Sequence, residues 1–130
     1  MKRNLIFVMV ILSILVVSCI ETNYPEEAIG NFIVHNDASS GKTITRIVVT
    51  TDWLAFGDPD TMLSENISIV SGGSSKKYGI DLKHSDYIGN WNGFRITITL
   101  NDNSSAFLRV KLYDDIDCVL RYNGTALVQE

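Results

Sequence analysis

The sequence has little of what usually marks a catalytic or metal-binding site. It contains two histidines among 130 residues, and His35 and His84 lie far apart with no further ligands at a metal-binding spacing. No serine stands in the Gly-x-Ser-x-Gly pattern of a nucleophile elbow. The run Gly72-Gly73-Ser74-Ser75-Lys76 lacks the spacing of a phosphate-binding loop and reads as a turn. We therefore expect a protein that is not an enzyme.

Positive charge is also scarce. The chain carries 11 Lys and Arg against 15 Asp and Glu, a net charge of −4. An acidic chain with scattered Lys and Arg lacks the electrostatic pattern of a nucleic-acid-binding protein. We expect no nucleic-acid partner.

One long apolar run is present, and it stands at the N-terminus. The basic stretch Met1-Lys2-Arg3-Asn4 is followed by Leu5 to Val17, which is apolar except for Ser13. This run is too short to span a bilayer as a helix, which needs about 20 residues. It has the length of the hydrophobic part of a secretion signal. We expect residues 1–18 to be a cleaved signal peptide.

The next residues carry a resemblance to a known family. Val16-Val17-Ser18-Cys19 resembles the lipobox of bacterial lipoproteins at all four positions. The resemblance implies cleavage before Cys19, a diacylglycerol on its thiol and acylation of the new amino group. The covalent lipid on Cys19 would then be the only cofactor, and membrane lipid a partner through its acyl chains. Because Ile20 is not acidic, the same resemblance favours the outer membrane or cell surface over the inner membrane.

The mature chain begins with a short tether. Residues 19–28 lack periodicity and contain Pro25 and three acids, and the nine residues after Cys19 extend at most about 30 Å. Loss of Lys2 and Arg3 with the signal leaves 9 basic against 15 acidic residues, a net charge of −6. We therefore expect the lipid, and not electrostatic attraction, to hold the protein at an anionic membrane.

Residues 29–130 show the two-residue period of β-strands. Apolar residues alternate with polar ones in several short runs, which are rich in β-branched side chains and separated by Gly, Asn and Ser turns. The clearest runs are Phe94–Leu100, Leu108–Leu112 and Tyr78–Leu82, with further strands expected around Phe32–Val34, Thr43–Thr51, Ile67–Ile69, Val119–Tyr122 and Ala126–Val128. The pattern predicts an all-β fold, an antiparallel β-sandwich of seven or eight strands in the style of immunoglobulin domains, with a small barrel as the alternative.

Two local predictions complete the fold. Asp58-Pro59-Asp60-Thr61-Met62-Leu63 has an Asp at the capping position and a Pro at the first helical position, which predicts a short helical turn. Cys118 stands in the run Cys118-Val119-Leu120, and we expect it to be buried and inert.

Candidate binding residues lie between the predicted strands. Trp53, Phe56, Tyr87 and Trp91 stand in loop segments beside Asn and Asp, where aromatic rings can contact a sugar or a protein partner. The same rings could instead close the ends of the sandwich. Asp114, Asp115 and Asp117 are weak candidates for calcium, with capping and turn hydrogen bonds as the alternative.

Taken together, these features predict a lipid-anchored, non-catalytic binding or structural module of the bacterial cell envelope. In layout the chain resembles small uncharacterised β-sandwich lipoproteins, with an envelope protein or glycan as the expected partner. The alternative is a carbohydrate- or calcium-dependent recognition domain that uses the loop aromatics and the acidic turns.

Overall fold

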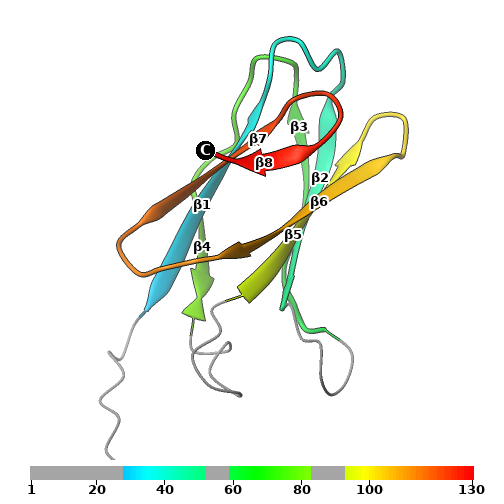
Figure 1. The fold of residues 1–130 in the computed structure, drawn as a ribbon. Helices are drawn as coiled ribbons and strands as arrows, with labels where there is room; N and C mark the ends of the chain where they lie inside the picture. The colour runs from blue at the N-terminus through cyan, green and yellow to red at the C-terminus, as the bar shows by residue number, and fades with distance from the viewer. Residues whose placement is uncertain (1–27, 52–58, 83–92) are drawn as a thin grey trace, which may run out of the picture.

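The computed structural model describes residues 28–51, 59–82 and 93–130. These residues form two four-stranded sheets that pack face to face, so the predicted β-sandwich is confirmed (Figure 1). The eight strands are β1 (Ile29–Asn36), β2 (Ile44–Thr51), β3 (Thr61–Ile69), β4 (Tyr78–Asp81), β5 (Gly93–Leu100), β6 (Ser105–Lys111), β7 (Asp117–Tyr122) and β8 (Leu127–Gln129).

One sheet has the strand order β4-β1-β7-β8 and is called sheet A here; the other, sheet B, has the order β3-β2-β5-β6. Neighbouring strands are antiparallel except for β1 and β7, which are parallel, with Phe32 opposite Cys118 and Asn36 opposite Tyr122. Sheet A therefore contains one parallel pair of strands, whereas the sequence predicted antiparallel pairing throughout. The parallel pair joins the first and the seventh strand at the centre of sheet A.

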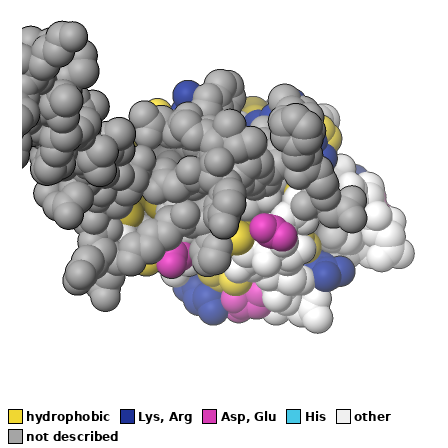
Figure 2. Space-filling model, turned by 90° about the horizontal axis from the view of Figure 1, so that it is seen from below, with side chains coloured by type: hydrophobic (Ala, Val, Ile, Leu, Met, Phe, Trp, Pro, Cys, Tyr) yellow, Lys and Arg dark blue, Asp and Glu magenta, His cyan; other side chains and the backbone are white. Residues whose placement is uncertain are grey.

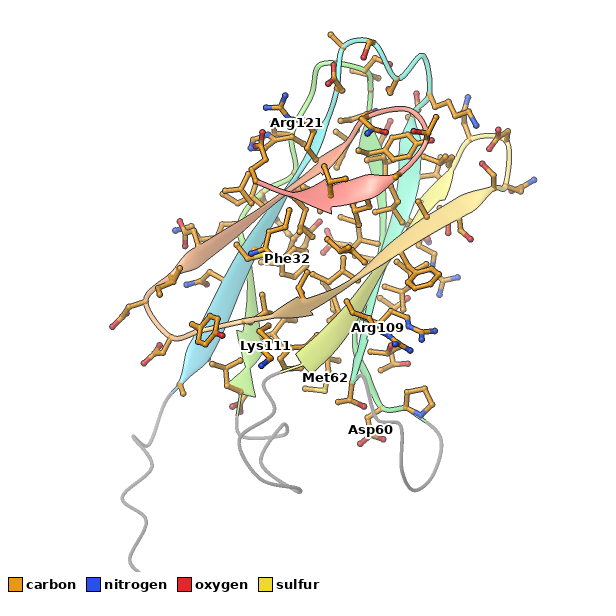
Figure 3. The ribbon with its side chains drawn as sticks, viewed as in Figure 1. Phe32, Asp60, Met62, Arg109, Lys111 and Arg121 are labelled. Atoms are coloured by element: carbon orange, nitrogen blue, oxygen red, sulfur yellow. The ribbon has the colours of Figure 1, made fainter. Side chains whose placement is uncertain are left out.

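The core lies between the sheets and follows from the two-residue period. Alternate side chains of each strand point inward, as Phe94, Ile96, Ile98 and Leu100 do on β5. Phe32 lies between the sheets (Figure 3) and stacks on Tyr78, with 5.1 Å between the ring centroids. The remaining fully buried apolar residues include Val34, Ile44, Ile47, Val49, Leu112 and Leu120.

Cys118 belongs to this core, as predicted. Its side chain is 5% exposed and forms no disulfide. Burial raises the pKa of its thiol, because the interior disfavours the charged thiolate. The reactive form of the thiol is therefore rare in the folded protein.

The predicted helical turn at residues 58–63 is wrong. Asp58 lies outside the described residues, but β3 already begins at Thr61. The Thr51 amide donates to the Asp60 carbonyl over 2.9 Å, and the Asp60 amide donates to the Thr51 hydroxyl over 2.9 Å. Pairing with β2 thus takes the backbone groups that a helical turn would have used, because tertiary pairing outweighs a local capping preference.

The strands run between two ends of the sandwich. At the lower end in Figure 1, β1 begins, β2 ends and β5 begins, with Thr51 opposite Phe94 and Ile29 opposite Asp81. The upper end carries the connections β1–β2, β3–β4, β5–β6 and β7–β8. Among the described residues, no helix is long and apolar enough to cross a membrane.

Candidate functional site

The residues predicted to carry function lie largely outside the described part of the chain. Cys19, Trp53, Phe56, Tyr87 and Trp91 all fall in residues 1–27, 52–58 or 83–92. What the structure does describe is where the flanking strands stand. Thr51 and Gly93, which border the two aromatic-bearing segments, belong to the neighbouring strands β2 and β5 and lie at the lower end of the sandwich. Ala28 precedes β1 at the same end, and Figure 2 looks onto it.

The acidic turn between β6 and β7 is held by hydrogen bonds and an ion pair. Asp114 Oδ1 accepts a hydrogen bond from the Ile29 amide at 3.3 Å, and the Asp117 carboxylate lies 2.6 Å from the Lys77 ammonium. Asp115 has a φ of 60°, a left-handed conformation that Asp tolerates in turns. Within the described residues, no group of three or more His, Cys, Asp or Glu side chains is placed to hold a metal ion. Asp114 and Asp117 therefore each have a partner within the protein.

A shallow polar pocket of about 270 Å³ lies on the outer side of sheet A near its upper end. His35 of β1, Ser74 of the β3–β4 connection and Arg121 of β7 line it, together with Asp37 and Glu130. Arg121 forms ion pairs with Glu130 and, over 3.9 Å, with Asp37. The positive charge of Arg121 is therefore compensated within the pocket by the carboxylates of Asp37 and Glu130.

His35 and Ser74 are hydrogen-bonded in this pocket, with 2.5 Å between Nδ1 and Oγ. A serine beside an imidazole is one part of a nucleophilic site, but an acyl-transfer site also needs amide donors for the developing oxyanion. The nearby amides of Gly72 and Gly73 already donate to the carbonyls of Asn36 and Val70, over 2.8 and 2.9 Å. What this pair offers a ligand is hydrogen bonding.

Sequence reasoning missed a second feature, the charge of the outer face of sheet B. Arg46 of β2, Arg95 of β5, and Arg109 and Lys111 of β6 all point away from the core. Glu65 is the only acidic residue in the described strands of this sheet. It stands opposite buried Ile47, on the core side, and pairs with Lys76 over 2.9 Å. Among the described residues, four cations therefore point outward from sheet B, although the chain as a whole is acidic.

An exposed aromatic ring stands among these cations. Phe107 of β6 is 57% exposed, and the Arg95 guanidinium lies 4.8 Å from its ring centroid, a cation–π contact. The alternation of Arg109 and Lys111 with Leu108 and Val110 was a sequence signal for outward-pointing cations. It could not show that β2, β5 and β6 are neighbours, which is what gathers the charges.

Comparison with known proteins assigns no family to this chain. No family model matches the chain, and no curated protein matches it. A protein from Eubacterium rectale, solved by NMR, is 13% identical, with a TM-score of 0.49 over 82% of this chain and 92% of that one.

Proposed function

We propose that this protein is a lipoprotein of the bacterial cell envelope, anchored by a lipid on Cys19 and most closely associated with the outer membrane or cell surface. The observation that carries the proposal is the four-position lipobox at Val16-Val17-Ser18-Cys19, directly after an apolar run of signal-peptide length. The position of β1 supports it. The first strand begins at Ile29, so the residues after Cys19 suffice for a tether of at most about 30 Å.

Within the envelope, we propose a non-catalytic role as a binding or structural module. The described residues form a two-sheet sandwich with its own core, and a shallow polar pocket on sheet A offers hydrogen bonds to a partner. The partners that fit this role are an envelope protein or a glycan.

Lipidation is tested with the Cys19→Ala variant of the full chain, expressed in a bacterium with a lipoprotein pathway. Wild-type protein should incorporate labelled palmitate and enter the detergent phase on phase partitioning, and Cys19→Ala should take up no label. Cys118→Ala is the matched control, because it removes the other cysteine of the chain and should leave the labelling unchanged. Equal labelling of Cys19→Ala and wild type would refute the lipoprotein proposal.

A second candidate is a carbohydrate- or calcium-dependent recognition domain. One observation favours it. Because Thr51 stands opposite Phe94, the segments that carry Trp53 and Trp91 leave neighbouring strands at one end of the sandwich. Aromatic side chains offer a large apolar face that can contact a sugar ring. Calorimetric titration with envelope glycans, with and without calcium, tests this candidate; it predicts heat with wild type and none with Trp53→Ala or Trp91→Ala.

A further inference from the structure

The polar pocket on sheet A, here called the His35 pocket, presents hydrogen-bond donors beside acceptors. Arg121 stands directly opposite His35 in the β1–β7 pair, so the two side chains are neighbours on the outer face of the sheet. The Arg121 guanidinium donates hydrogen bonds, and the carboxylates of Asp37 and Glu130 accept them. The His35 Nδ1 is hydrogen-bonded to Ser74 Oγ, which leaves Nε2 as the nitrogen that can meet a ligand. Donors and acceptors thus alternate within one pocket.

One ion pair of the pocket is too long for a direct hydrogen bond. Arg121 Nη1 and Asp37 Oδ2 are 3.9 Å apart, whereas direct N–H···O bonds measure about 2.7–3.2 Å. A hydroxyl group beside both atoms can accept a hydrogen bond from the guanidinium and donate one to the carboxylate. Hydrogen bonds from the amide and the hydroxyl of Ser39 hold the pKa of Asp37 below its usual range, so this carboxylate is an ionised acceptor at neutral pH. The gap therefore selects a group that is donor and acceptor at once.

The pocket is preformed and has the size of one small unit. The Asp37 amide donates to the Tyr122 carbonyl over 2.9 Å, which holds the end of β1 against β7. The Asn36 amide donates to the Gly73 carbonyl over 2.9 Å, which holds the β3–β4 connection beside β1. A ligand thus loses little binding energy in ordering the site. The volume of about 270 Å³ is near the lower end of ligand pockets, roughly 300–1,000 Å³, and suits one unit of a polymer that continues beyond the pocket.

The His35 pocket lies away from the end of the molecule where the chain from Cys19 enters the fold. From Ile29 to His35 the strand β1 rises by about 20 Å. Figure 3 shows Arg121 near the upper end of the sandwich, whereas β1 begins at the lower end. The proposed tether therefore holds the opposite end of the sandwich at the membrane and leaves the pocket open to the glycans that surround it.

We propose that the His35 pocket binds one sugar unit of an envelope glycan. One hydroxyl of the unit lies between Arg121 and Asp37, and a neighbouring hydroxyl reaches the Glu130 carboxylate. The proposal rests on the binding role proposed above, for which it names the partner class, and it assigns a site separate from the aromatic loops. A sugar suits the paired ions because each of its hydroxyls can donate one hydrogen bond and accept others.

Other ligand classes fit this pocket less well. An anion such as phosphate would meet two carboxylates and one guanidinium, and it would have to break the ion pairs of Arg121 with Asp37 and Glu130. A peptide side chain that anchors an interface needs a dry, apolar pocket, and Ala38 is the only described lining residue with an apolar side chain. Val128, 38% exposed and opposite Arg121 on β8, offers a small apolar surface beside the pocket for the C–H groups of a sugar ring.

The test uses the full lipidated protein on vesicles of phosphatidylcholine, with four neutral disaccharides as probes: maltose, cellobiose, lactose and N,N′-diacetylchitobiose. Saturation-transfer NMR shows which sugar binds and gives its Kd. We expect binding of at least one disaccharide, and Arg121→Gln should weaken it by at least about tenfold, because a charge-assisted hydrogen bond is lost. Arg46→Gln is the matched control. It makes the same change on the outer face of sheet B, where Arg46 donates to the Ser64 hydroxyl over 2.8 Å, and should leave the Kd unchanged.

Wild-type protein alone gives a second readout, because the chain contains two histidines, His35 and His84. Diethyl pyrocarbonate modifies imidazole nitrogens, and mass spectrometry follows both residues in one sample. At a sugar concentration ten times the Kd, modification of His35 should slow by about tenfold, since the reagent reaches only the unoccupied pocket. His84 should react at an unchanged rate.

Several results would overturn the proposal. If none of the four disaccharides protects His35, or if Arg121→Gln leaves the Kd unchanged, the pocket is not a sugar site. Protection of His84 in place of His35 would assign the sugar to the segment of Tyr87 and Trp91. Stronger protection of His35 by inorganic phosphate or by alanylalanine than by any sugar would assign the pocket to an anion or a peptide. Failure of the lipid anchor is distinguishable, because the protein would then no longer float with the vesicles, whereas protection of His35 does not depend on flotation.

Discussion

At the scale of single residues, Asn36 has a role that its neighbours on β1 do not share. It is a polar residue 1% exposed, and its Nδ2 donates to the carbonyls of Lys42 and Ile69, over 2.7 and 2.9 Å. These carbonyls lie where the chain enters β2 and leaves β3, so one side chain of sheet A holds two strands of sheet B. Its Oδ1 is buried without a hydrogen-bond partner in the described structure.

Asn36→Ala should therefore destabilise the fold by about 1–3 kcal/mol, because it removes two hydrogen bonds between the sheets, one of them buried, although the Lys42 carbonyl keeps the hydroxyls of Ser40 and Ser71 as donors. Urea unfolding followed by fluorescence measures the change. Asn66→Ala on the exposed side of β3 removes the same side chain without those bonds, and should alter stability by less than about 0.5 kcal/mol. An equal effect of the two substitutions would show that the Asn36 bonds add nothing to stability.

Asp102 makes the stability depend on pH. The Lys42 ammonium, 2.8 Å away, together with the hydroxyl and amide of Ser104, holds the pKa of Asp102 well below its usual range. A carboxylate whose pKa is lowered by folding stabilises the native state above its unfolded value of about 3.9. This contribution is lost as the pH falls from about 4 toward the folded value.

Asp102→Asn should accordingly lower the midpoint of urea unfolding at pH 7 and have a smaller effect at about pH 3, where part of the contribution has already gone. Lys42→Gln removes the same ion pair from the other side and should show the same trend. A difference between Asp102→Asn and wild type that is constant from pH 7 to 3 would contradict the assignment.

At the scale of elements, Gly30 shows how closely β1 approaches the crossover between the sheets. A Cβ at this position would stand 2.5 Å from Leu112 Cβ and 2.8 Å from Leu82 Cδ2. The Leu112 Cβ cannot swing away as the tip of a side chain can, so the backbone after β6 would have to move. Only glycine allows these two leucines to cover the start of β1.

Gly30→Ala should destabilise the fold by about 1–3 kcal/mol, the usual effect of overpacking a filled interior. Thermal unfolding checks this, with Ser105→Ala at the exposed start of β6 as the control. If Gly30→Ala is as stable as the control, the end of β6 is not fixed against β1.

The elements also show where sequence reasoning succeeds and where it stops. The alternation in Phe94–Leu100 and Tyr78–Leu82 predicted both the strands and their buried faces. This was possible because a half-buried strand alternates apolar and polar residues within a few positions of the sequence. The prediction of a helical turn at residues 58–63 was wrong because the local sequence pattern does not show that Asp60 pairs with Thr51 of another strand. The grouping of cations on the outer face of sheet B was missed for the same reason, since Arg95 and Arg109 become neighbours only once β5 and β6 pair.

At the scale of the whole molecule, the parallel pair β1–β7 ties the two ends of the chain together. Phe32 and Cys118 are partners across this pair although 85 residues separate them in sequence. Closing such a loop is slow and yields nothing until both strands are in place, so folding is expected to be cooperative and to take milliseconds to seconds. The β1–β7 pair is then present only in the fully folded molecule.

Cys118 can report on this cooperativity. With Cys19 acylated it is the only thiol, and at 5% exposure beside β1 it should react with a thiol reagent only when the whole sandwich opens. We expect one reactive thiol per chain in denaturant and labelling that is slower under native conditions by about the unfolding equilibrium constant. Asn36→Ala and Gly30→Ala should speed the native labelling in proportion to their loss of stability, although neither residue is next to Cys118 in sequence. If neither substitution changes the rate of labelling under native conditions, then β7 opens on its own. In that case the β1–β7 pair does not make the sandwich a single cooperative folding unit.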